Sequence, residues 1–381
     1  MKNIQISPSY KPAYYYGGPT MSVSKLCEEL VKAETPVTVL TTTANGAAEL
    51  PAGSRIIDGV PVHYHPRMTG DPTHFSPSLL KTLDRTLKLS RSHQTIVHIH
   101  SWWNLVTIFS CWIAKRRKVA VLLSPRGMLT TYTLGNRNTG MKHIIHSLLG
   151  KSLLKYSHIH ATSAKEKQDL LKIIKPKSIT VIPNFVRFPQ EPQAARSVAD
   201  GALQLLFLSR IEEKKGLDIL FKALSQVNFE WQLAIAGSGT ASYVDNLKHI
   251  ASELNIGQFI SWKGHITDED KFSVMENHDL LVLPSHNENF ANVVIESLAV
   301  GTPVLLSDRV GLSEYIIEQQ LGWISKLNPK EFAHTLQQIH ADKSQLDKIR
   351  SRAPAIIRRD FNEIKIVDQY IDLYNRILTN G

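Results

Sequence analysis

Residues 285–304 read SHNENFANVVIESLAVGTPV and follow the apolar run from Leu280 to Pro284. In a parallel sheet, ligands bind where such a strand ends, so the loop that follows it is a candidate site. Phe290 to Val293 are expected to open a helix whose free backbone N–H groups and dipole can hold a phosphate. Glu296, one turn into that helix, can accept hydrogen bonds from vicinal hydroxyls, and Glu288 in the loop can meet a second polyol. The stretch therefore predicts an α/β fold with a site for a ligand that carries phosphate and sugar hydroxyls.

Short apolar runs alternate with amphipathic stretches along the chain, which indicates βαβ units and a parallel sheet. In the first half the expected strands are Ile4 to Ser7, Val37 to Thr41, Ile96 to His100, Val119 to Ser124, His158 to Ser163 and Ile179 to Pro183, and the expected helices are Thr20 to Ala33, Pro77 to Leu89, Asn104 to Arg117, Met141 to Tyr156 and Ala164 to Ile174. In the second half we expect strands at Leu203 onward, Gln232 to Ala236, Phe259 to Trp262, Leu280 to Pro284, Pro303 to Leu306 and Gly322 to Ser325, with helices from Gly216, Tyr243, Asp268, Asn292 and Ser313.

The polar stretch QEPQAARSVADG at residues 190–201 interrupts this alternation. A chain of 381 residues is also too long for one core of ordinary size. We therefore expect two Rossmann-like domains, at residues 1–189 and 190–361. The final segment, residues 362–381, is helical in pattern and is expected to complete the first domain.

The net charge of +10 is uneven, because residues 1–190 hold 25 Lys and Arg against 9 Asp and Glu, whereas residues 191–381 hold 19 against 25. The first half is expected to face phosphate-bearing substrates, a lipid surface or nucleic acid, unless the charge is only a solvated surface. A non-enzymatic module that binds nucleic acid or an anionic surface would need aromatic residues on a basic platform. The tryptophans at 102, 103 and 112 fall on or beside an expected strand end and helix instead, so nucleic acid is not an expected partner.

The sequence holds no run of about 18 apolar residues, as a membrane span would require. The opening MKNIQISPSY also lacks the layout of a signal peptide. We therefore expect a cytoplasmic protein.

A second cluster of charges lies in Ser209 to Leu217, SRIEEKKGL. Arg210 ends the first expected strand of the second half, and Lys215 precedes Gly216 at a helix start. Two cations at these positions can neutralise a diphosphate and its departing charge. Such a cluster can also be a solvated loop, but its place on a strand end that neighbours the Glu288 loop favours a shared site.

A wider set of motifs runs through the chain in order: Tyr16-Gly17-Gly18-Pro19, His98 with His100, Ser124-Pro125-Arg126-Gly127, Ser163, Pro183-Asn184, Ser209-Arg210 with Lys214-Lys215-Gly216, and Glu288 with Glu296. This set resembles the large GT4 family of retaining glycosyltransferases over nearly the whole chain. The most specific part is the pair of glutamates followed by Ala299-x-Gly301-x-Pro303-Val304. The resemblance implies a GT-B fold, in which two Rossmann-like domains with parallel sheets face a central cleft.

The resemblance also implies donor-binding roles in the second domain. Arg210 and Lys215 resemble the family's diphosphate clamp, and Glu296 resembles its ribose ligand. The grip on the donor sugar is expected from Glu288 with the backbone of Asn289, Phe290, Ala291 and Asn292, next to Val293. Gly264, His265 and Ile266 match a loop that borders the base.

In the first domain, Gly17 and Gly18 look like the loop that approaches the phosphates, where the lack of a Cβ permits close backbone contact. His100 is similar to the histidine that reaches the transferred sugar. The family's frequent Gly before the loop aromatic is Asn289 here, and the common His of a Pro-His-Gly turn is Arg126. Arg126 and Asn184 are expected on the acceptor side, where the extra cation suits a phosphorylated or carboxylated partner, with a helix-cap or surface role as the alternative.

Similar enzymes retain the anomeric configuration without an evident nucleophile, so we predict front-face departure of the diphosphate, whose own oxygen takes the acceptor proton. The expected co-substrate is a nucleotide-diphosphate sugar, with no cofactor and no metal because Arg210 and Lys215 neutralise the charge. The expected acceptor is a saccharide or a lipid-linked molecule of cell-surface or exopolysaccharide biosynthesis. Residues 141–156, MKHIIHSLLGKSLLKY, alternate Lys with Ile and Leu in a way that fits peripheral contact with an anionic membrane at its inner face, although packing against the sheet accounts for the pattern more simply.

Three other patterns point to different chemistry. Asp268-Glu269-Asp270 has the D-x-D form of metal-dependent transferases, although an acidic first helix turn accounts for it more simply. Gly237-Ser238-Gly239 follows a strand, as in an NAD-dependent oxidoreductase, but Ser242 stands at the place of the third glycine. The pairs His63/His65, His98/His100 and His158/His160 each put two imidazoles on one strand face without an obvious third metal ligand.

Overall fold

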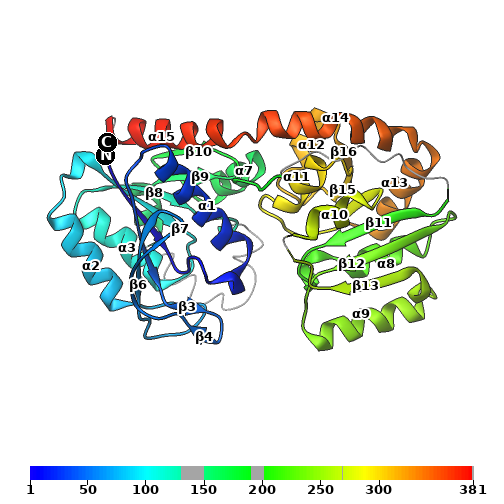
Figure 1. The fold of residues 1–381 in the computed structure, drawn as a ribbon, viewed down its shortest axis with the longest axis horizontal. Coiled ribbons are helices and arrows are strands. Elements are labelled where there is room, and N and C mark those ends of the chain that lie inside the picture. The colour runs from blue at the N-terminus through cyan, green and yellow to red at the C-terminus, as the bar shows by residue number, and fades with distance from the viewer. Residues whose placement is uncertain (130–149, 190–200, 268, 380–381) are drawn as a thin grey trace. The chain divides into compact units, whose positions relative to one another are not determined.

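The computed structural model describes residues 1–129, 150–189, 201–267 and 269–379. Its contacts divide the chain into two compact units (Figure 1). Unit 1 consists of Met1–Phe185 with Glu363–Gly381, and unit 2 of Val186–Asn362, compared with the predicted ranges 1–189 with 362–381 and 190–361. The expected boundary segment at residues 190–200, residues 141–149 of an expected helix and Asp268 lie outside the described residues.

Within the described residues, unit 1 is built on an eight-stranded sheet in the order β10-β9-β8-β7-β1-β2-β6-β5. The strands are β1 (Lys2–Ser7), β2 (Val37–Thr42), β5 (Gly53–Ile57), β6 (Val60–His65), β7 (Thr95–His100), β8 (Ala120–Ser124), β9 (His158–Ala161) and β10 (Ser178–Val181), and a separate small ribbon pairs β3 (Ala44–Asn45) with β4 (Ala48–Glu49). The helices are α1 (Gly18–Lys32), α2 (Pro77–Lys88), α3 (Leu105–Arg116), α6 (Lys151–Tyr156), α7 (Ala164–Ile173) and α15 (Glu363–Thr379), with short 3-10 turns η1 (Tyr14–Tyr16) and η2 (Ser92–Gln94).

The hairpin of β5 and β6 was not expected from the sequence, and it is the one antiparallel pair of the unit 1 sheet in the described residues. Its turn consists of Asp58 and Gly59, which both adopt positive φ angles, 49° and 82°. A two-residue Asp-Gly turn between short apolar runs is a strong hairpin signal, because its backbone twist matches that of the strands. The expected all-parallel sheet is therefore corrected at this edge.

Side-chain caps mark the starts of three helices of unit 1, α2, α3 and α7. Ser76 accepts from the Leu79 N–H before α2, Asn104 accepts from the Thr107 N–H before α3, and Ser163 accepts from the Glu166 N–H before α7. Each cap satisfies a backbone donor that has no partner within its own helix.

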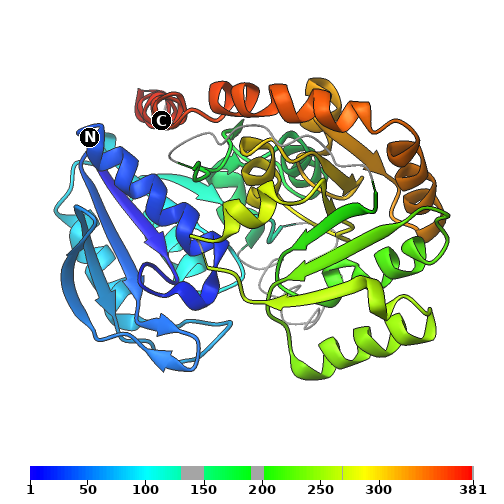
Figure 2. The same cartoon turned by 45° about the vertical axis from the view of Figure 1, so that its right-hand side comes forward.

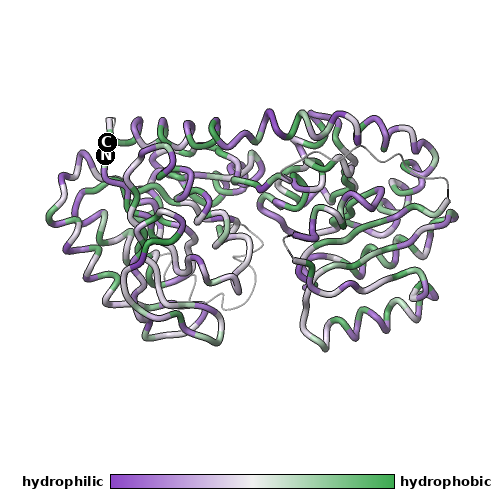
Figure 3. The backbone as a smooth tube through the Cα atoms, in the orientation of Figure 1, coloured by the Kyte–Doolittle hydropathy of each residue, from purple (hydrophilic) through white to green (hydrophobic). Residues whose placement is uncertain are grey.

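The central strands of unit 1 have two different buried faces. On β7, Val97 and Ile99 belong to the apolar core that includes Leu79 and Leu83 of α2 and Val106 of α3. Because side chains alternate along a strand, His98 and His100 point to the opposite face. That face is covered by α15, whose Tyr370 and Tyr374 contact His98. The apolar stripes on the strands and helices can be followed in Figure 3.

Unit 2 has a fully parallel six-stranded sheet in the order β13-β12-β11-β14-β15-β16. Its strands are β11 (Leu203–Leu208), β12 (Trp231–Ala236), β13 (Ile260–Gly264), β14 (Leu280–Leu283), β15 (Val304–Ser307) and β16 (Gly322–Ser325). Its helices are η4 (Glu213–Lys215), α8 (Leu217–Leu224), α9 (Ala241–Glu253), η5 (Gly257–Phe259), α10 (Lys271–Glu276), α11 (Asn292–Ala299), α12 (Ser313–Gln319), α13 (Pro329–Ala341) and α14 (Ser344–Asp360). Figure 2 shows helices on both faces of this sheet.

The strand order of unit 2 corresponds to 3-2-1-4-5-6 in chain order, the arrangement of a Rossmann fold. The order reverses between β11 and β14, and ligands of such sheets bind outside the carboxyl ends of the strands at this reversal. In unit 1 the corresponding reversal lies between β1 and β7. The expected fold of two Rossmann-like domains is confirmed. In the part of the chain that the structure describes, no helix combines the length and apolar character of a membrane span.

Candidate functional site

The loops after β11 and β14 pack directly against each other at the strand reversal of unit 2. The His286 N–H donates to the Lys214 carbonyl oxygen at 2.8 Å. Gly216 has a φ of +70°, and a Cβ added to it would lie 2.1 Å from the Pro284 carbonyl oxygen. Only glycine fits this turn, so the Lys-Lys-Gly motif sets how closely the two loops approach.

Lys215 and Glu288 form an ion pair across these two loops. Their side chains are 7% and 20% exposed. Burial lowers the pKa of Lys215 to about 7, and the positive charges of Lys214 and Arg210 add to this effect. The Glu288 carboxylate favours the protonated ammonium. Lys215 was predicted to hold the diphosphate and Glu288 the sugar. The fold brings these two residues into contact although they lie 73 positions apart in the chain.

Arg210 is placed differently from its predicted partner Lys215. Its side chain is 67% exposed and pairs with Glu212 at 2.7 Å. Exposed ion pairs of this kind contribute little to stability, so the guanidinium can leave Glu212 at small cost. Its charge acts on the pKa of Lys215, which places both cations in one region.

The stretch after Glu288 turns into α11 through a left-handed residue. Ala291 has a φ of +66° and precedes Asn292, the first residue of α11. Phe290 is buried against Phe361, with ring centroids 6.0 Å apart, so its side chain belongs to the core and only its backbone faces the loop. Ala291 has no polar side chain to cap the helix, and the first N–H groups of α11, including that of Val293, are oriented toward the loop.

Glu296, the predicted ribose ligand, lies one turn into α11 and pairs with Lys271 of α10 at 2.8 Å. The two side chains are 11% and 14% exposed. The sequence interpretation missed Lys271, because the residue lies 25 positions before Glu296 in an acidic segment without a recognisable motif. Lys271 holds the Glu296 carboxylate in place and adds a third cation to this edge of unit 2.

The Gly237-Ser238-Gly239 fragment has a packing role. A Cβ on Gly237 would lie 1.8 Å from the Ser209 carbonyl oxygen, and the Ile211 N–H donates to the Ser238 carbonyl oxygen at 2.8 Å. The small residues therefore let the loops after β11 and β12 approach each other. Gly264 ends β13 beside them, where its carbonyl oxygen accepts from the Gly237 N–H, and His265 beyond it is exposed while Ile266 is half-buried.

In unit 1, Gly17 and Gly18 begin α1, after the long loop that follows β1. Gly17 is the residue before the helix, and an added Cβ at either glycine would meet open space. They therefore lie at the strand reversal of unit 1 with an exposed helix start. Their predicted approach to phosphates stays a prediction.

His100, at the carboxyl end of β7, is 1% exposed. Its Nε2 lies 2.6 Å from Gln5 Oε1, and its Nδ1 accepts from Arg126 Nε at 3.4 Å. Burial lowers its pKa well below the ordinary value for histidine, and His98, Arg126 and His160 lower it further. The structure thus places a neutral His100 inside unit 1, and its predicted contact with the transferred sugar stays a prediction.

His100 belongs to a chain of buried hydrogen bonds. The donor and acceptor capacity of each group requires all of these bonds to point in the same direction along the chain. The Ile182 carbonyl oxygen can only accept, so His160 donates from Nε2 and accepts from Ser124 at Nδ1. Ser124 then accepts from His98 Nε2, and His98 Nδ1 accepts from the Tyr374 hydroxyl. Three further bonds complete the chain. Gln5 Nε2 donates to the Tyr374 hydroxyl, His100 Nε2 donates to Gln5 Oε1, and Arg126 Nε donates to His100 Nδ1. We name these residues the histidine chain.

Arg126 and Asn184, both predicted on the acceptor side, are neighbours. Arg126 Nη1 donates to Asn184 Oδ1 at 3.0 Å. Arg126 follows β8 with a φ of +52°, and Gly127 after it has a φ of +78°. This turn carries the guanidinium back toward His100.

The two patterns that suggested a metal, the histidine pairs and the D-x-D motif, have other roles in the described residues. His98 and His160 both bond to Ser124, His158 bonds to Ser178, and His63 bonds to Ser54. Asp270 accepts from the Thr267 hydroxyl at 2.9 Å next to α10, while Asp268 lies outside the described residues. Over the described ranges, no group of three His, Cys, Asp or Glu side chains is arranged to hold a metal ion.

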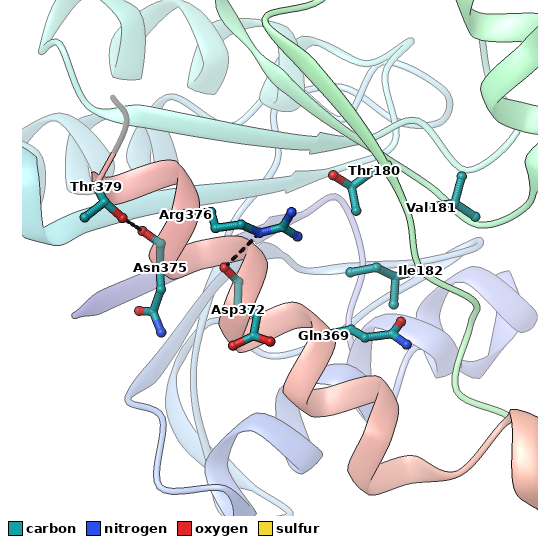
Figure 4. A pocket seen from close by; sticks show the side chains of 8 residues that line it. All are labelled: Thr180, Val181, Ile182, Gln369, Asp372, Asn375, Arg376 and Thr379. Carbon is teal, nitrogen blue, oxygen red and sulfur yellow. Dashed lines mark hydrogen bonds between the residues drawn. The ribbon is translucent and has the colours of Figure 1, made fainter.

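A groove between β10 and α15 of unit 1 contains none of the predicted site residues (Figure 4). It is lined by polar residues that include Thr180, Asp372 and Arg376, and Arg376 donates to the Asp372 carbonyl oxygen at 3.4 Å. No pair of opposed reactive groups is present among its lining residues. The groove is therefore separate from the candidate sites at the strand reversals.

Comparison with known proteins gives matches to both halves of the chain. The model of Glycosyltransferase Family 4 matches residues 16–188, and the model of Glycosyl transferases group 1 matches residues 190–355. A glycogen synthase of Mycobacterium tuberculosis (strain CDC 1551 / Oshkosh) is 27% identical over 232 residues, which cover 60% of this chain and 55% of that protein. A D-inositol 3-phosphate glycosyltransferase of Mycobacterium sp. (strain KMS) is 29% identical over 195 residues, 48% of this chain and 42% of that protein. The chain spans about half the length of the curated relatives that it matches.

Solved structures show the same fold over the whole chain. Sucrose-phosphate synthase from Thermosynechococcus elongatus superimposes with a TM-score of 0.74 at 20% identity, covering 100% of both chains. HepE of Anabaena, solved in complex with UDP and glucose, has a TM-score of 0.73 at 16% identity, covering 99% of this chain and 100% of the other. At these identities the likeness concerns the fold alone. From the two family models and this shared fold we conclude that the chain belongs to the GT4-type glycosyltransferases and has their GT-B fold.

Proposed function

We propose that this protein transfers a sugar from a nucleotide-diphosphate sugar to a saccharide or lipid-linked acceptor, with retention of anomeric configuration and without a metal. The observation that carries the proposal is the ion pair of Lys215 with Glu288 at the strand reversal of unit 2. The paired residues come from the two loops that flank this reversal. A ligand bound there meets a cation for its diphosphate and a carboxylate for a sugar hydroxyl.

The donor is held in parts by neighbouring groups of unit 2. Lys215 and Arg210 neutralise the diphosphate and the charge that grows on it as the glycosidic bond breaks. The α11 N–H groups after Ala291 contact the donor, and Glu296 accepts from the ribose hydroxyls while Lys271 orients its carboxylate. Gly264, His265 and Ile266 border the base. HepE, a structural neighbour, was solved with UDP, which supports a nucleotide of this class.

The pairing of Glu288 supports a mechanism without an enzymic nucleophile. A carboxylate in contact with Lys215 is stabilised as an anion and is a weakened nucleophile. The departing diphosphate oxygen therefore takes the acceptor proton on the same face of the sugar, which preserves the configuration. The protein supplies positioning and charge.

The acceptor contributes to a cell-surface polysaccharide in this proposal, and the protein acts in the cytoplasm. The names of two relatives support this context, since one is a lipopolysaccharide core biosynthesis glycosyltransferase of Rhizobium meliloti and the other is the galactosyltransferase WaaB of the lipopolysaccharide outer core.

A thermal-shift screen tests the donor assignment. The full chain is heated with UDP, GDP, ADP, CMP and their sugars, and the true donor nucleotide stabilises it by about 2.7 kcal/mol at a hundredfold excess over Kd. NMR of the product with the matching sugar then reports the anomeric configuration, and EDTA tests for a metal. The proposal fails if no nucleotide stabilises the protein, and retention fails if the product anomer is inverted.

Peripheral contact with an anionic membrane is a second proposal, carried by a basic surface on α3 and α6. Trp112 is 41% exposed and lies under the Arg116 guanidinium. Lys115 bonds to Ser152 of α6, and Lys151 and Lys155 are exposed on the same helix. Basic residues around an exposed Trp are typical of an interfacial contact. Flotation with phosphatidylglycerol vesicles at low and high salt tests it, because salt-insensitive or absent binding contradicts the proposal.

A further inference from the structure

Arg126 is a half-buried cation of unit 1 that, unlike Lys11 and Arg67, has no carboxylate partner in the part of the chain that the structure describes. Lys11 pairs with Glu28 and Asp58, and Arg67 pairs with Glu49 and Asp71. Arg126 has only neutral partners among the described residues, His100 and Asn184. A guanidinium has five N–H donors, so most of this fork is left without a protein acceptor.

The Glu166 carboxylate, which acts electrostatically on Arg126, forms its hydrogen bonds with other groups. Glu166 accepts from the Gly127 N–H at 2.8 Å, from the Thr162 N–H at 2.7 Å and from the Thr162 hydroxyl at 3.0 Å. It therefore stabilises the turn that carries Arg126 and forms no ion pair with the guanidinium. Removing part of a cation from water without a counter-charge costs free energy, which a bound anion would recover.

The surroundings hold the guanidinium rigidly in place. Arg126 is the donor at one end of the histidine chain, where its Nε is bonded to His100, and its Nη1 is bonded to Asn184. The histidine chain is anchored at its other end by the Ile182 carbonyl oxygen. The left-handed backbone at Arg126 and Gly127 turns the side chain into this position. Strained backbone of this kind is retained at sites that bind ligands.

The charge of the cluster is also well defined. Burial keeps the pKa values of His98 and His100 well below the ordinary histidine value, and that of His160 at about 3. The three imidazoles are therefore neutral at physiological pH, and Arg126 supplies a single fixed positive charge. A planar guanidinium with available N–H groups can donate two parallel hydrogen bonds to the oxygens of a phosphate or a carboxylate, which a neutral sugar hydroxyl cannot accept.

We propose that Arg126 is the anion-recognition residue of the acceptor site, so that the acceptor carries a phosphate or a carboxylate group. The proposal specifies the acceptor of the proposed function and rests on that function, because an acceptor site exists only in a glycosyltransferase. Asn184 positions the guanidinium through Nη1, and His100 positions it through Nε. The anion accepts from the N–H groups that have no partner in the described residues.

The test measures anion binding to the full-length protein by calorimetry, with inorganic phosphate, acetate and glucose as probes. UDP is present at saturation so that phosphate cannot occupy the diphosphate site. The Arg126→Met variant removes the charge, Arg126→Lys keeps the charge without the fork, and Asn184→Ala removes one positioning bond. Arg117→Met is the matched control, because Arg117 lies in the same unit and pairs with Asp84.

Phosphate or acetate is expected to bind the wild type at least tenfold more tightly than Arg126→Met, with Arg126→Lys and Asn184→Ala in between. Glucose is expected to show no dependence on Arg126, and Arg117→Met is expected to behave as the wild type. Binding of phosphate alone identifies a phosphorylated acceptor, and binding of acetate alone identifies a carboxylated one. UDP affinity is expected to be the same in all variants, which also shows that each variant is folded.

Equal anion binding by the wild type and Arg126→Met overturns the proposal while leaving the donor assignment intact. Failure of UDP to bind the wild type overturns the proposed function instead, and the measurement is then repeated in Lys215→Ala without UDP. Arg126-dependent phosphate binding in that variant supports an anion site, and its absence overturns the site as well.

Discussion

The two units share a Rossmann-like architecture but place their polar residues in different ways. In unit 2 the central strand β14 is apolar throughout, and the charged residues Lys215 and Glu288 lie in loops beyond the strand ends. In unit 1 the strands themselves carry a buried polar face, formed by Gln5, His98 and His160 and covered by α15. Single substitutions in the loops of unit 2 are therefore expected to change donor binding and turnover. In unit 1 a substitution in the buried hydrogen-bond network is expected to change the stability of the whole unit.

The largest difference between the units is expected on acidification. His98, His100 and His160 are buried with pKa values well below 6.5, that of His160 being about 3. In the unfolded chain they take up protons as the pH falls below about 6.5, so the unfolded state binds more protons and the free energy of unfolding falls with pH. Each of these histidines contributes up to about 1.4 kcal/mol per pH unit to the loss, from about pH 6 down to its own pKa in the folded protein.

Hydrogen exchange followed by mass spectrometry resolves this acid effect by unit. Amides of β7, β8 and α15 are expected to lose protection before those of β11 and β14. The exposed His93 provides a matched control, since His93→Gln is expected to leave the acid transition unchanged. Simultaneous loss of protection in both units at the same pH contradicts the prediction.

Lys215→Ala tests the loop chemistry of unit 2. Removing a cation that meets the charge developing on the departing diphosphate is expected to lower kcat by about 10²–10³, or about 3 kcal/mol, as for the loss of an oxyanion donor. The measurement is steady-state turnover with the donor identified in the thermal-shift screen. Lys222→Ala is the control, because Lys222 is an exposed lysine of α8 in the same unit. Unchanged turnover in Lys215→Ala would remove Lys215 from the site.

Tyr374→Phe tests the network of unit 1. The hydroxyl accepts from Gln5 and donates to His98, so its loss leaves the buried His98 Nδ1 without a partner and Gln5 Nε2 with Asn3 Oδ1 alone. The free energy of unfolding of unit 1 is expected to fall by about 1–3 kcal/mol. Urea unfolding measures it, and Tyr315→Phe in unit 2, which loses one partly buried bond to Asp360, is expected to cost less. Equal effects of the two substitutions would argue against a special network in unit 1.

The pH dependence of donor binding sharpens the role of Lys215. Its pKa of about 7 means that the ammonium is already present below pH 7 and is lost above it. Diphosphate binding above pH 7 then requires proton uptake, and the affinity for UDP is expected to fall by up to tenfold per pH unit, or about 1.4 kcal/mol. Calorimetry at several pH values measures this slope. Lys215→Arg is expected to flatten it, and a flat wild-type profile would contradict the assignment.

The smallest expected effect is at Ala291. Glycine adopts the left-handed backbone of this residue without the steric penalty of a Cβ, so Ala291→Gly is expected to raise the free energy of unfolding of unit 2 by about 1 kcal/mol or less. Ala251→Gly, in the interior of α9, is the control and is expected to lower it by about 1 kcal/mol. Destabilisation by both substitutions would show that the strain at Ala291 is offset by its packing.

The predicted elements of unit 2 agree closely with the structure, because each strand is an apolar run and each following loop carries its own signal. Lys215 and Glu288 could be assigned to one site for this reason, since both follow strands that meet at the reversal. The partner of Glu296 could not be assigned. Lys271 lies in an acidic segment, and nothing local distinguishes it from a solvated lysine.

Unit 1 was harder to predict for a physical reason that its histidines illustrate. His98 and His100 alternate with Val97 and Ile99, which predicts a strand with one polar face and normally indicates exposure to water. That face is buried because α15, more than 270 residues away in the chain, supplies Tyr374 as a partner for His98. The hairpin at Asp58 and Gly59, by contrast, had a local signal that was overlooked.

The amino-acid sequence by itself determined the order of strands and helices, the two-domain architecture and the loops that carry charge, because these depend on local periodicity and on turn and capping residues. Only the tertiary structure decided which charges are paired, which histidines are buried and neutral, and that Arg126 has no carboxylate partner among the described residues. These properties depend on burial and on contacts between segments far apart in the chain, and neither quantity is encoded in the neighbours of a single residue.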